Sequence, residues 1–153
     1  MEYLSNIRQT IVVRKDLNMR KGKIAAQVAH ASNVPLVNLI KLTEKYFLMQ
    51  KGRHPGDGRD KDFKNLAEKY TAEKTIIESW IYENKYTKIV LGCNSEEELL
   101  DLIKKSQELE IPCYPIYDMG LTEFHGKETL TCCSFGPFEK EKLDKLTGKL
   151  QLI

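Results

Sequence analysis

The stretch that decides the fold is TIVVRKDLNMRKGKIAAQVAHA, residues 10–31. It opens with the β-branched run Thr10–Arg14, which has the length of a strand and is continuous enough to be buried. A polar loop follows at Lys15–Arg20, and from about Gly22 the apolar spacing becomes helical. The apolar residues that recur at helical intervals are Ile24, Val28 and Ala31. A strand that leads through a short loop into a helix indicates an α/β fold.

A second helical region is expected beyond this unit. Pro35 is predicted to break or kink the first helix, because proline removes a backbone donor. The Gly- and charge-rich segment Lys51–Asp62 indicates a solvent loop, and a second helix is expected from about Asp62 to Glu83. Trp80 falls at the apolar spacing of that helix, so we interpret it as a core residue rather than a platform for stacking bases.

The rest of the chain alternates between strands and helices. Ser95, followed by three glutamates, is predicted to be the N-cap of a third helix that ends near Glu110. Gly136-Pro137 is expected to stop the last strand. The other predicted elements are strands at Lys88–Gly92, Cys113–Tyr117 and Leu130–Phe135 and a final helix at Glu139–Thr147.

This order of elements predicts an α/β protein with three layers, α/β/α, around a four-stranded, mixed and mostly parallel sheet. The short link between the third and fourth strands favours antiparallel pairing of those two. With 153 residues, the chain fits one domain spanning residues 1–153.

Composition and charge restrict the possible functions. The net charge is only +2, but residues 1–30 hold six basic and two acidic side chains, which favours a local phosphate-facing patch. No stretch approaches the roughly 20 apolar residues of a membrane span, and the N-terminus lacks the layout of a secretory signal. We therefore expect a cytoplasmic protein without a membrane partner.

The cysteines and histidines show no metal-binding pattern. Cys93, Cys113, Cys132 and Cys133 lack CxxC spacing and are expected to be free thiols. The adjacent Cys132 and Cys133 are interpreted as packing residues. His54 and His125 lie in polar loops and are expected to have surface or capping roles. The sequence thus predicts neither a metal site nor a bound cofactor.

Residues suited to anion binding gather at the start of the first helix. Lys21, Gly22 and Lys23 lie where free backbone N–H groups and the helix dipole attract an anion. Lys23, Gln27 and His30 follow at i, i+4 and i+7, so they share one face of the helix. A merely solvated helix face has the same pattern, so spacing alone leaves both interpretations open.

Asp118 lies at the end of the predicted third strand, followed by Met119-Gly-Leu-Thr122. Open α/β sheets form clefts at the carboxyl ends of their strands, so this aspartate is either catalytic or the cap of a turn. The chain contains no GxxxxGK[ST], GxGxxG or GxSxG motif. A nucleotide-binding loop and a covalent serine mechanism are therefore not expected.

Three blocks resemble the peptidyl-tRNA hydrolases of the archaeal and eukaryotic type. Val12–Ala31 is similar to the opening of that family, and Ile116–Thr122 is similar to its Asp-Ala-Gly-Arg-Thr turn. Phe135-Gly-Pro together with Asp144–Leu150 resembles the C-terminal signature. Between these blocks, a loop-helix segment around residues 50–74 looks like an enlargement within the single domain.

The resemblance implies hydrolysis of the ester bond of peptidyl-tRNA, with Lys23, Gln27, Asp118 and Thr122 as the site. In the implied mechanism, Asp118 accepts a proton from the attacking water while Lys23 stabilises the oxyanion. Thr122 orients the water or the carboxylate, and Gln27 holds the carbonyl or the ribose. Thr131 and His30 are further candidates, and Arg14, Arg20 and Lys21 are expected to meet tRNA phosphates.

The resemblance also implies a homodimer. Two alternatives to the hydrolase stay open on the sequence, because Leu121 and Glu123 replace an arginine and a glutamine of the family turn. One is a non-catalytic descendant that binds tRNA or a protein, and the other is a hydrolase of another acylated tRNA.

Overall fold

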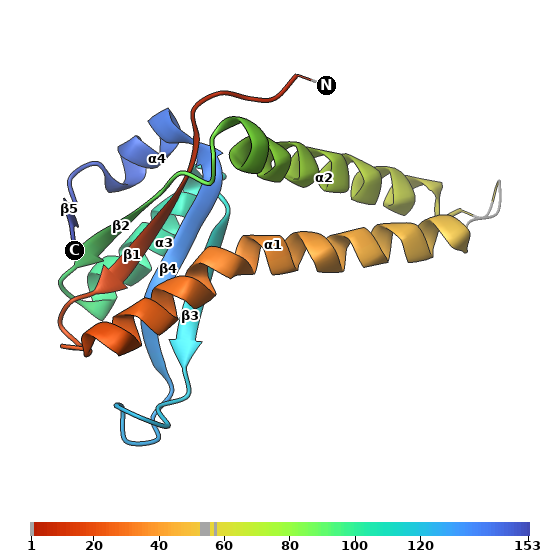
Figure 1. Ribbon diagram of the computed structural model, residues 1–153. Coiled ribbons are helices and arrows are strands. Elements are labelled where there is room, and N and C mark those ends of the chain that lie inside the picture. The colour runs from red at the N-terminus through yellow and green to blue at the C-terminus, as the bar shows by residue number, and fades with distance from the viewer. Residues whose placement is uncertain (1, 53–55, 57) are drawn as a thin grey trace.

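The computed structural model describes residues 2–52, 56 and 58–153 of the chain (Figure 1). His54, expected to have a surface or capping role, is outside the described residues. The elements of the described part are β1 (Ile7–Arg14), α1 (Lys21–Lys51), α2 (Asp60–Glu78), the π-helical turn η1 (Ser79–Glu83), β2 (Lys88–Cys93), α3 (Glu96–Glu108), β3 (Cys113–Asp118), β4 (Thr129–Glu139), α4 (Lys140–Thr147) and β5 (Gln151–Leu152).

The described strands form one mixed sheet of five strands in the order β3-β4-β1-β2-β5. Within it, β1 and β2 are parallel, whereas β3–β4, β4–β1 and β2–β5 are antiparallel. An α/β fold with a single mixed sheet is confirmed, as is antiparallel pairing of the third and fourth strands. The predictions of four strands and of a mostly parallel sheet are wrong. Strand β4 runs against both of its neighbours, and β5 has two residues, too few to give a sequence signal.

Strand β4 is longer than predicted, because it continues through Gly136-Pro137 to Glu139. Gly136 and Pro137 together oppose the single residue Gln9 of β1, which is the arrangement of a β-bulge. Gly136 has a φ of 83°, a conformation that glycine adopts without strain. The prediction that this pair stops the strand is therefore wrong, since a bulge absorbs it.

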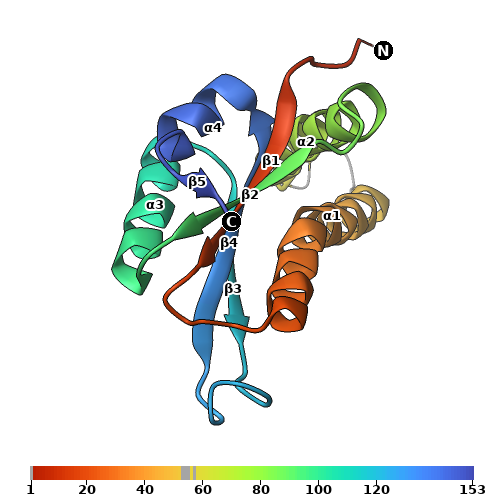
Figure 2. The ribbon, with the colours of Figure 1, turned by 60° about the vertical axis from the view of Figure 1, so that its left-hand side comes forward.

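Strand β1 is buried along its whole length, and its side chains alternate between two cores. Ile11 and Val13 pack in the cluster that includes residues of α1, whereas Val12 packs with residues of α3 and α4. Figure 2 shows α1 and the pair α3 and α4 on opposite sides of the sheet. Cys132 and Cys133 of β4 divide between the same two clusters, so the prediction that they are packing residues is confirmed.

Helix α1 runs unbroken from Lys21 to Lys51 although Pro35 lies inside it. Proline has no N–H, so the carbonyl of Ala31, four residues earlier, lacks its intrahelical donor. The buried side chain of Gln9 replaces that donor, because its Nε2 donates to the Ala31 carbonyl at 3.2 Å. Of the break or kink expected at Pro35, the break is therefore wrong, for a tertiary reason that the local sequence does not contain. The kink stays a prediction.

Helices α1 and α2 form a hairpin that extends beyond the sheet (Figure 1). Tyr46 of α1 stacks on Phe63 and Tyr70 of α2, with ring centroids 5.6 and 4.6 Å apart. Helix α2 ends at Glu78 instead of Glu83, and η1 follows. Trp80 of η1 is fully buried, which confirms its assignment to the core.

The range 50–74 thus includes the end of α1 and most of α2. Its interpretation as an enlargement relative to the family stays a prediction. None of the helices in the described part has both the length and the apolarity that crossing a bilayer requires.

Candidate active site

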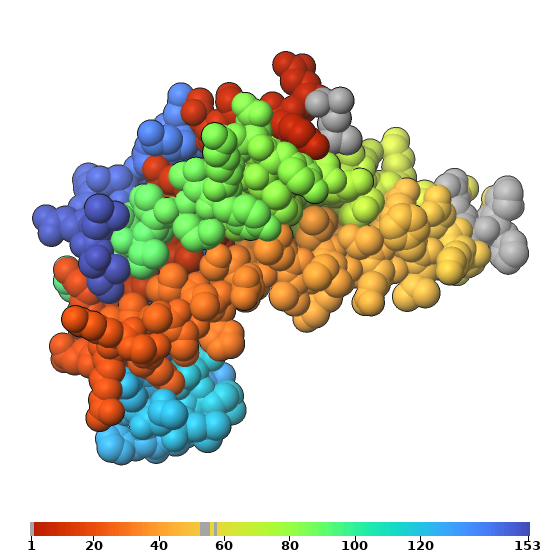
Figure 3. All heavy atoms as spheres, viewed as in Figure 1, coloured from red at the N-terminus to blue at the C-terminus, as the bar shows by residue number. Residues whose placement is uncertain are grey.

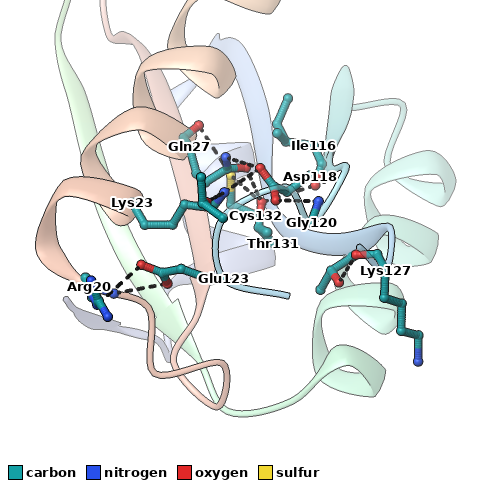
Figure 4. Close-up of polar contacts among 12 residues, drawn as sticks. Arg20, Lys23, Gln27, Ile116, Asp118, Gly120, Glu123, Lys127, Thr131 and Cys132 are labelled. Carbon is teal, nitrogen blue, oxygen red and sulfur yellow. Dashed lines mark hydrogen bonds and ion pairs between the residues drawn. The ribbon is translucent and has the colours of Figure 1, made fainter. Parts of the chain in front are cut away.

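Lys23 and Asp118 meet where β3 ends beside the first turn of α1 (Figure 4). Lys23 Nζ donates hydrogen bonds to Asp118 Oδ2 at 2.7 Å and to Thr122 Oγ1 at 3.0 Å. The side chains of Lys23 and Asp118 are 12% and 15% exposed, so the ion pair is largely sheltered from water. An ammonium group has three N–H donors, which leaves one of them for an incoming group.

Asp118 accepts hydrogen bonds on both carboxylate oxygens. Gln27 Nε2 donates to Oδ2 at 3.1 Å, beside Lys23, and the backbone N–H of Gly120 donates to Oδ1 at 2.9 Å. The hydrogen bond from Lys23 is the main reason that the pKa of Asp118 is lowered, against the opposing effect of partial burial. One oxygen therefore caps the turn while the other holds the lysine. The turn-cap interpretation is confirmed, and the catalytic role of Asp118 stays a prediction.

The Gln27 side chain is also hydrogen-bonded to Thr131 of β4. Thr131 Oγ1 donates to Gln27 Oε1 at 2.7 Å, and the two residues are 0% and 4% exposed. This bond fixes the amide so that its Nε2 points at Asp118. Thr131 thus joins the site indirectly, through the orientation of Gln27.

The loop between β3 and β4 folds tightly at Gly120, whose φ is 78°. A Cβ atom at this position would come within 2.5 Å of the carbonyl oxygen of Lys127, so only glycine fits without rearrangement. The folded loop brings Glu123 to the start of α1, where its carboxylate accepts from the backbone N–H of Arg20 at 3.4 Å (Figure 4). The loop is therefore anchored to the same helix turn that carries Lys23.

The side chains around the ion pair line a groove of about 500 Å³ between α1 and β3. Lys23, Gln27 and His30 line it from the helix, which confirms that the three share one face. Asp118 and Thr122 line the other wall. Figure 3 shows the amino-terminal half of α1, in orange, beside the lobe formed by β3 and its following loop, in cyan.

The three residues predicted to meet phosphates differ in exposure. Arg20 and Lys21 are exposed at the N-terminus of α1, and the Arg20 side chain is 91% accessible. The Arg14 side chain is only 9% exposed, and its guanidinium donates to the Asp16 carboxylate at 2.7 and 3.1 Å. Arg14 also donates to the carbonyl of Leu130 at 3.0 Å, so its donors tie β1 to β4 instead of facing outward.

Two features of the site are absent from the sequence analysis. The ring centroid of Phe124 lies 5.4 Å from Lys23 Nζ, within cation–π range, and no sequence signal indicates this contact. Large apolar side chains also line the groove, at Tyr117, Met119 and Leu121. The period-two alternation of a strand does not identify this set, because Met119 and Leu121 lie beyond the end of β3.

Comparisons with known proteins support the sequence resemblance. Residues 7–153 match the family Peptidyl-tRNA hydrolase PTH2. The peptidyl-tRNA hydrolase of Methanopyrus kandleri is 33% identical over 146 residues, which cover 95% of this chain and 97% of that protein. Those of Methanothermobacter thermautotrophicus (34%, covering 96% and 100%) and Nanoarchaeum equitans (36%, covering 95% and 98%) are similar throughout as well. The chain therefore belongs to the Peptidyl-tRNA hydrolase PTH2 family.

Proposed function

We propose that this protein hydrolyses the ester bond of peptidyl-tRNA and releases free tRNA and peptide. The observation that carries the proposal is the position of Lys23, whose ammonium is held by Asp118 and Thr122 at the wall of an open groove. Membership of the PTH2 family supports the choice of substrate.

In the proposed reaction, a water oxygen attacks the ester carbonyl carbon, and the bond from that carbon to the ribose oxygen breaks. One proton of the water ends on the ribose hydroxyl that leaves. Negative charge develops on the carbonyl oxygen, where an N–H of Lys23 stabilises it. A fixed cation that is largely sheltered from water is suited to this, because it needs little rearrangement when the charge appears.

Asp118 acts mainly by position in this proposal. Its lowered pKa makes the carboxylate a weak proton acceptor, so a role as the strong general base is disfavoured. It holds Lys23 in place and accepts a hydrogen bond from the attacking water. Thr122, which accepts from Lys23, keeps its own O–H to donate to the water or the substrate.

Gln27 and Thr131 form the support for this pair. Because Thr131 fixes the Gln27 amide, Gln27 keeps Asp118 from rotating away from Lys23. Arg20 and Lys21 are proposed to contact tRNA phosphates beside the helix N-terminus, which itself favours an anion. We leave Arg14 out of this set, because its donors already bind Asp16 and the β4 backbone.

The test uses one tRNA carrying leucine with either a free or an acetylated amino group. Purified protein is expected to release acetyl-leucine, and free leucine much more slowly. No release, combined with tRNA binding that weakens as salt increases, would instead support a non-catalytic tRNA-binding protein. Equal release of both would support a less selective aminoacyl-tRNA esterase.

We also propose that the protein acts in the cytoplasm, where peptidyl-tRNA is produced, and that it forms a homodimer. The support for both is the family resemblance. Sedimentation at micromolar concentration distinguishes a dimer from a particle of 17.7 kDa, the mass of one chain.

A further inference from the structure

The groove changes in character along α1. The residues that line it from this helix are, in order, Lys23, Gln27, His30 and Val34. At 1.5 Å per residue, this wall is about 16 Å long. It begins with a cation at the helix N-terminus, continues through two uncharged or weakly basic polar groups, and ends with an aliphatic side chain.

The opposite wall changes in the same direction. Asp118 lies beside Lys23, whereas Ile116 and Pro115 lie earlier in β3. Ile116 and Val34 belong to one apolar cluster, so the apolar parts of both walls adjoin. The groove therefore has a charged end at Lys23 and Asp118 and an apolar end at Val34, Pro115 and Ile116.

The β3 side of the groove also exposes large apolar side chains. Tyr117, Met119 and Leu121 are 53%, 64% and 89% exposed, and all three line the groove. Exposed apolar groups that gather around a concave site are typical of ligand contacts. Leu121 in particular contributes little to the packed core, because most of its surface is accessible.

A peptidyl-tRNA substrate has two chemically different parts on either side of its ester. The tRNA part carries phosphates, and the exposed cations Arg20 and Lys21 lie at the charged end of the groove. At the apolar end, a phosphate would lose hydration without gaining a partner. The acyl part, by contrast, can bury apolar surface there.

We infer that the apolar end, Val34, Pro115 and Ile116, binds the acyl part and favours an apolar side chain on the residue esterified to tRNA. Tyr117, Met119 and Leu121 add apolar surface along the β3 side of the same groove. This inference rests on the proposed hydrolysis. It fixes the direction of the substrate in the groove, with the tRNA at Lys21 and the peptide toward Val34.

The experiment uses a single tRNA body charged with N-acetyl-leucine or with N-acetyl-glycine, so that only the acyl side chain differs. The ratio of kcat/KM for leucine over glycine is expected to be about tenfold or more, as for an aliphatic side chain that fills a pocket. Amide-linked versions of the two acyl-tRNAs, which cannot undergo ester hydrolysis, give the same comparison as dissociation constants.

Two variants remove apolar surface from the groove, and each has a matched control on α1. Val34→Thr nearly preserves shape and is matched by Ile40→Thr, since Ile40 is 61% exposed and lies outside the groove lining. Leu121→Ser is matched by Leu48→Ser, since Leu48 is 71% exposed. The groove variants are expected to lower the leucine-to-glycine ratio about threefold or more, with unchanged affinity for deacylated tRNA. The controls are expected to change neither.

Equal kcat/KM for the two acyl groups in the wild type would overturn the inference. The inference would also be overturned if the groove variants weakened the binding of deacylated tRNA as much as they lowered the leucine-to-glycine ratio. The terminal nucleoside of tRNA would then occupy the apolar end. If the wild type releases neither acyl group, the proposed hydrolysis is wrong. Binding of the two amide-linked acyl-tRNAs then tests the apolar subsite separately. Tighter binding of the leucyl form then supports the apolar subsite, and equal binding rejects it.

Discussion

Replacing Thr131 with valine removes the hydroxyl that orients Gln27 while nearly preserving the shape of the side chain. The lost bond is short, 2.7 Å, and both partners are buried, so Gln27 Oε1 is left without its donor. An unpaired buried acceptor costs about 1–3 kcal/mol. The Gln27 amide, without its donor, would no longer hold Asp118 in the transition state. A loss of about 1–3 kcal/mol there corresponds to a roughly 5- to 150-fold lower kcat.

The assay is release of N-acetyl-leucine from tRNA across a range of acidic pH. Gln27 is one of the groups that lower the pKa of Asp118, so its loss raises this pKa toward the ordinary value. The pH at which activity falls on the acid side should therefore move upward. Thr131→Ser, which keeps the hydroxyl, should restore both kcat and the acid limb.

Thr147→Val is the matched control. Thr147 is also buried, and its hydroxyl donates to Leu143 O within α4, away from the groove. We expect Thr147→Val to lower Tm by about 2–4 °C for each kcal/mol lost from the free energy of unfolding, and to leave kcat unchanged. Thr131→Val with wild-type kcat and an unmoved acid limb would refute the positioning role of Thr131.

Three further predictions concern the carboxylate, the turn and the cations. The pKa of Asp118 is lowered from 3.8 in the folded protein, so the Asp118 carboxylate contributes to activity and stability at neutral pH. This contribution should be lost only as pH falls below about 4, which a pH–rate profile and acid unfolding both measure. Gly120→Ala should lower Tm and kcat, since its Cβ would lie 2.5 Å from a backbone oxygen. Gly126→Ala is the control, because Gly126 has the same φ of 78° but no atom within 4 Å of the added Cβ, so it measures the cost of φ alone. Equal effects of the two changes would contradict the steric explanation. Arg20→Ala and Lys21→Ala should each weaken tRNA binding evenly across tRNAs and reduce the slope of log affinity against log salt by about 1; an unchanged slope would place both side chains away from phosphate.

Local patterns predict much of this fold. The strand and helix of residues 10–31 follow from β-branching and from helical apolar spacing. Ser95 is the N-cap as predicted, and its side chain accepts from the Glu98 N–H at 3.0 Å. Such signals need only neighbours in sequence, which explains why they can be identified without a structure.

The wrong predictions depend on distant contacts. Pro35 stays inside α1 because Gln9, 26 positions earlier in the chain and on a different element, donates to the Ala31 carbonyl that lacks its intrahelical donor. Gly136-Pro137 stays inside β4 because β1 accommodates a bulge opposite Gln9. Single-residue rules for proline and glycine do not contain either contact.

The site shows the same division. The spacing of Lys23 and Gln27 on one helix face is local and predictable, and so is the position of Asp118 at a strand end. That Thr131 lies behind Gln27 depends on β4 being inserted between β3 and β1, which chain order does not determine. The pairing of the buried Arg14 side chain with Asp16 likewise becomes visible only in the folded chain.

The most direct test of the account is the rate at which Lys23→Met and Asp118→Asn release N-acetyl-leucine from tRNA, beside Lys45→Met as a control on the exposed face of α1. Lys23→Met keeps the aliphatic stem but removes the cation proposed to stabilise the oxyanion. We predict a loss of kcat of about 10²–10³-fold for Lys23→Met, as for removal of an oxyanion donor, a marked loss for Asp118→Asn, and wild-type kcat for Lys45→Met. Wild-type kcat in Lys23→Met would contradict the central claim that this ammonium stabilises the oxyanion.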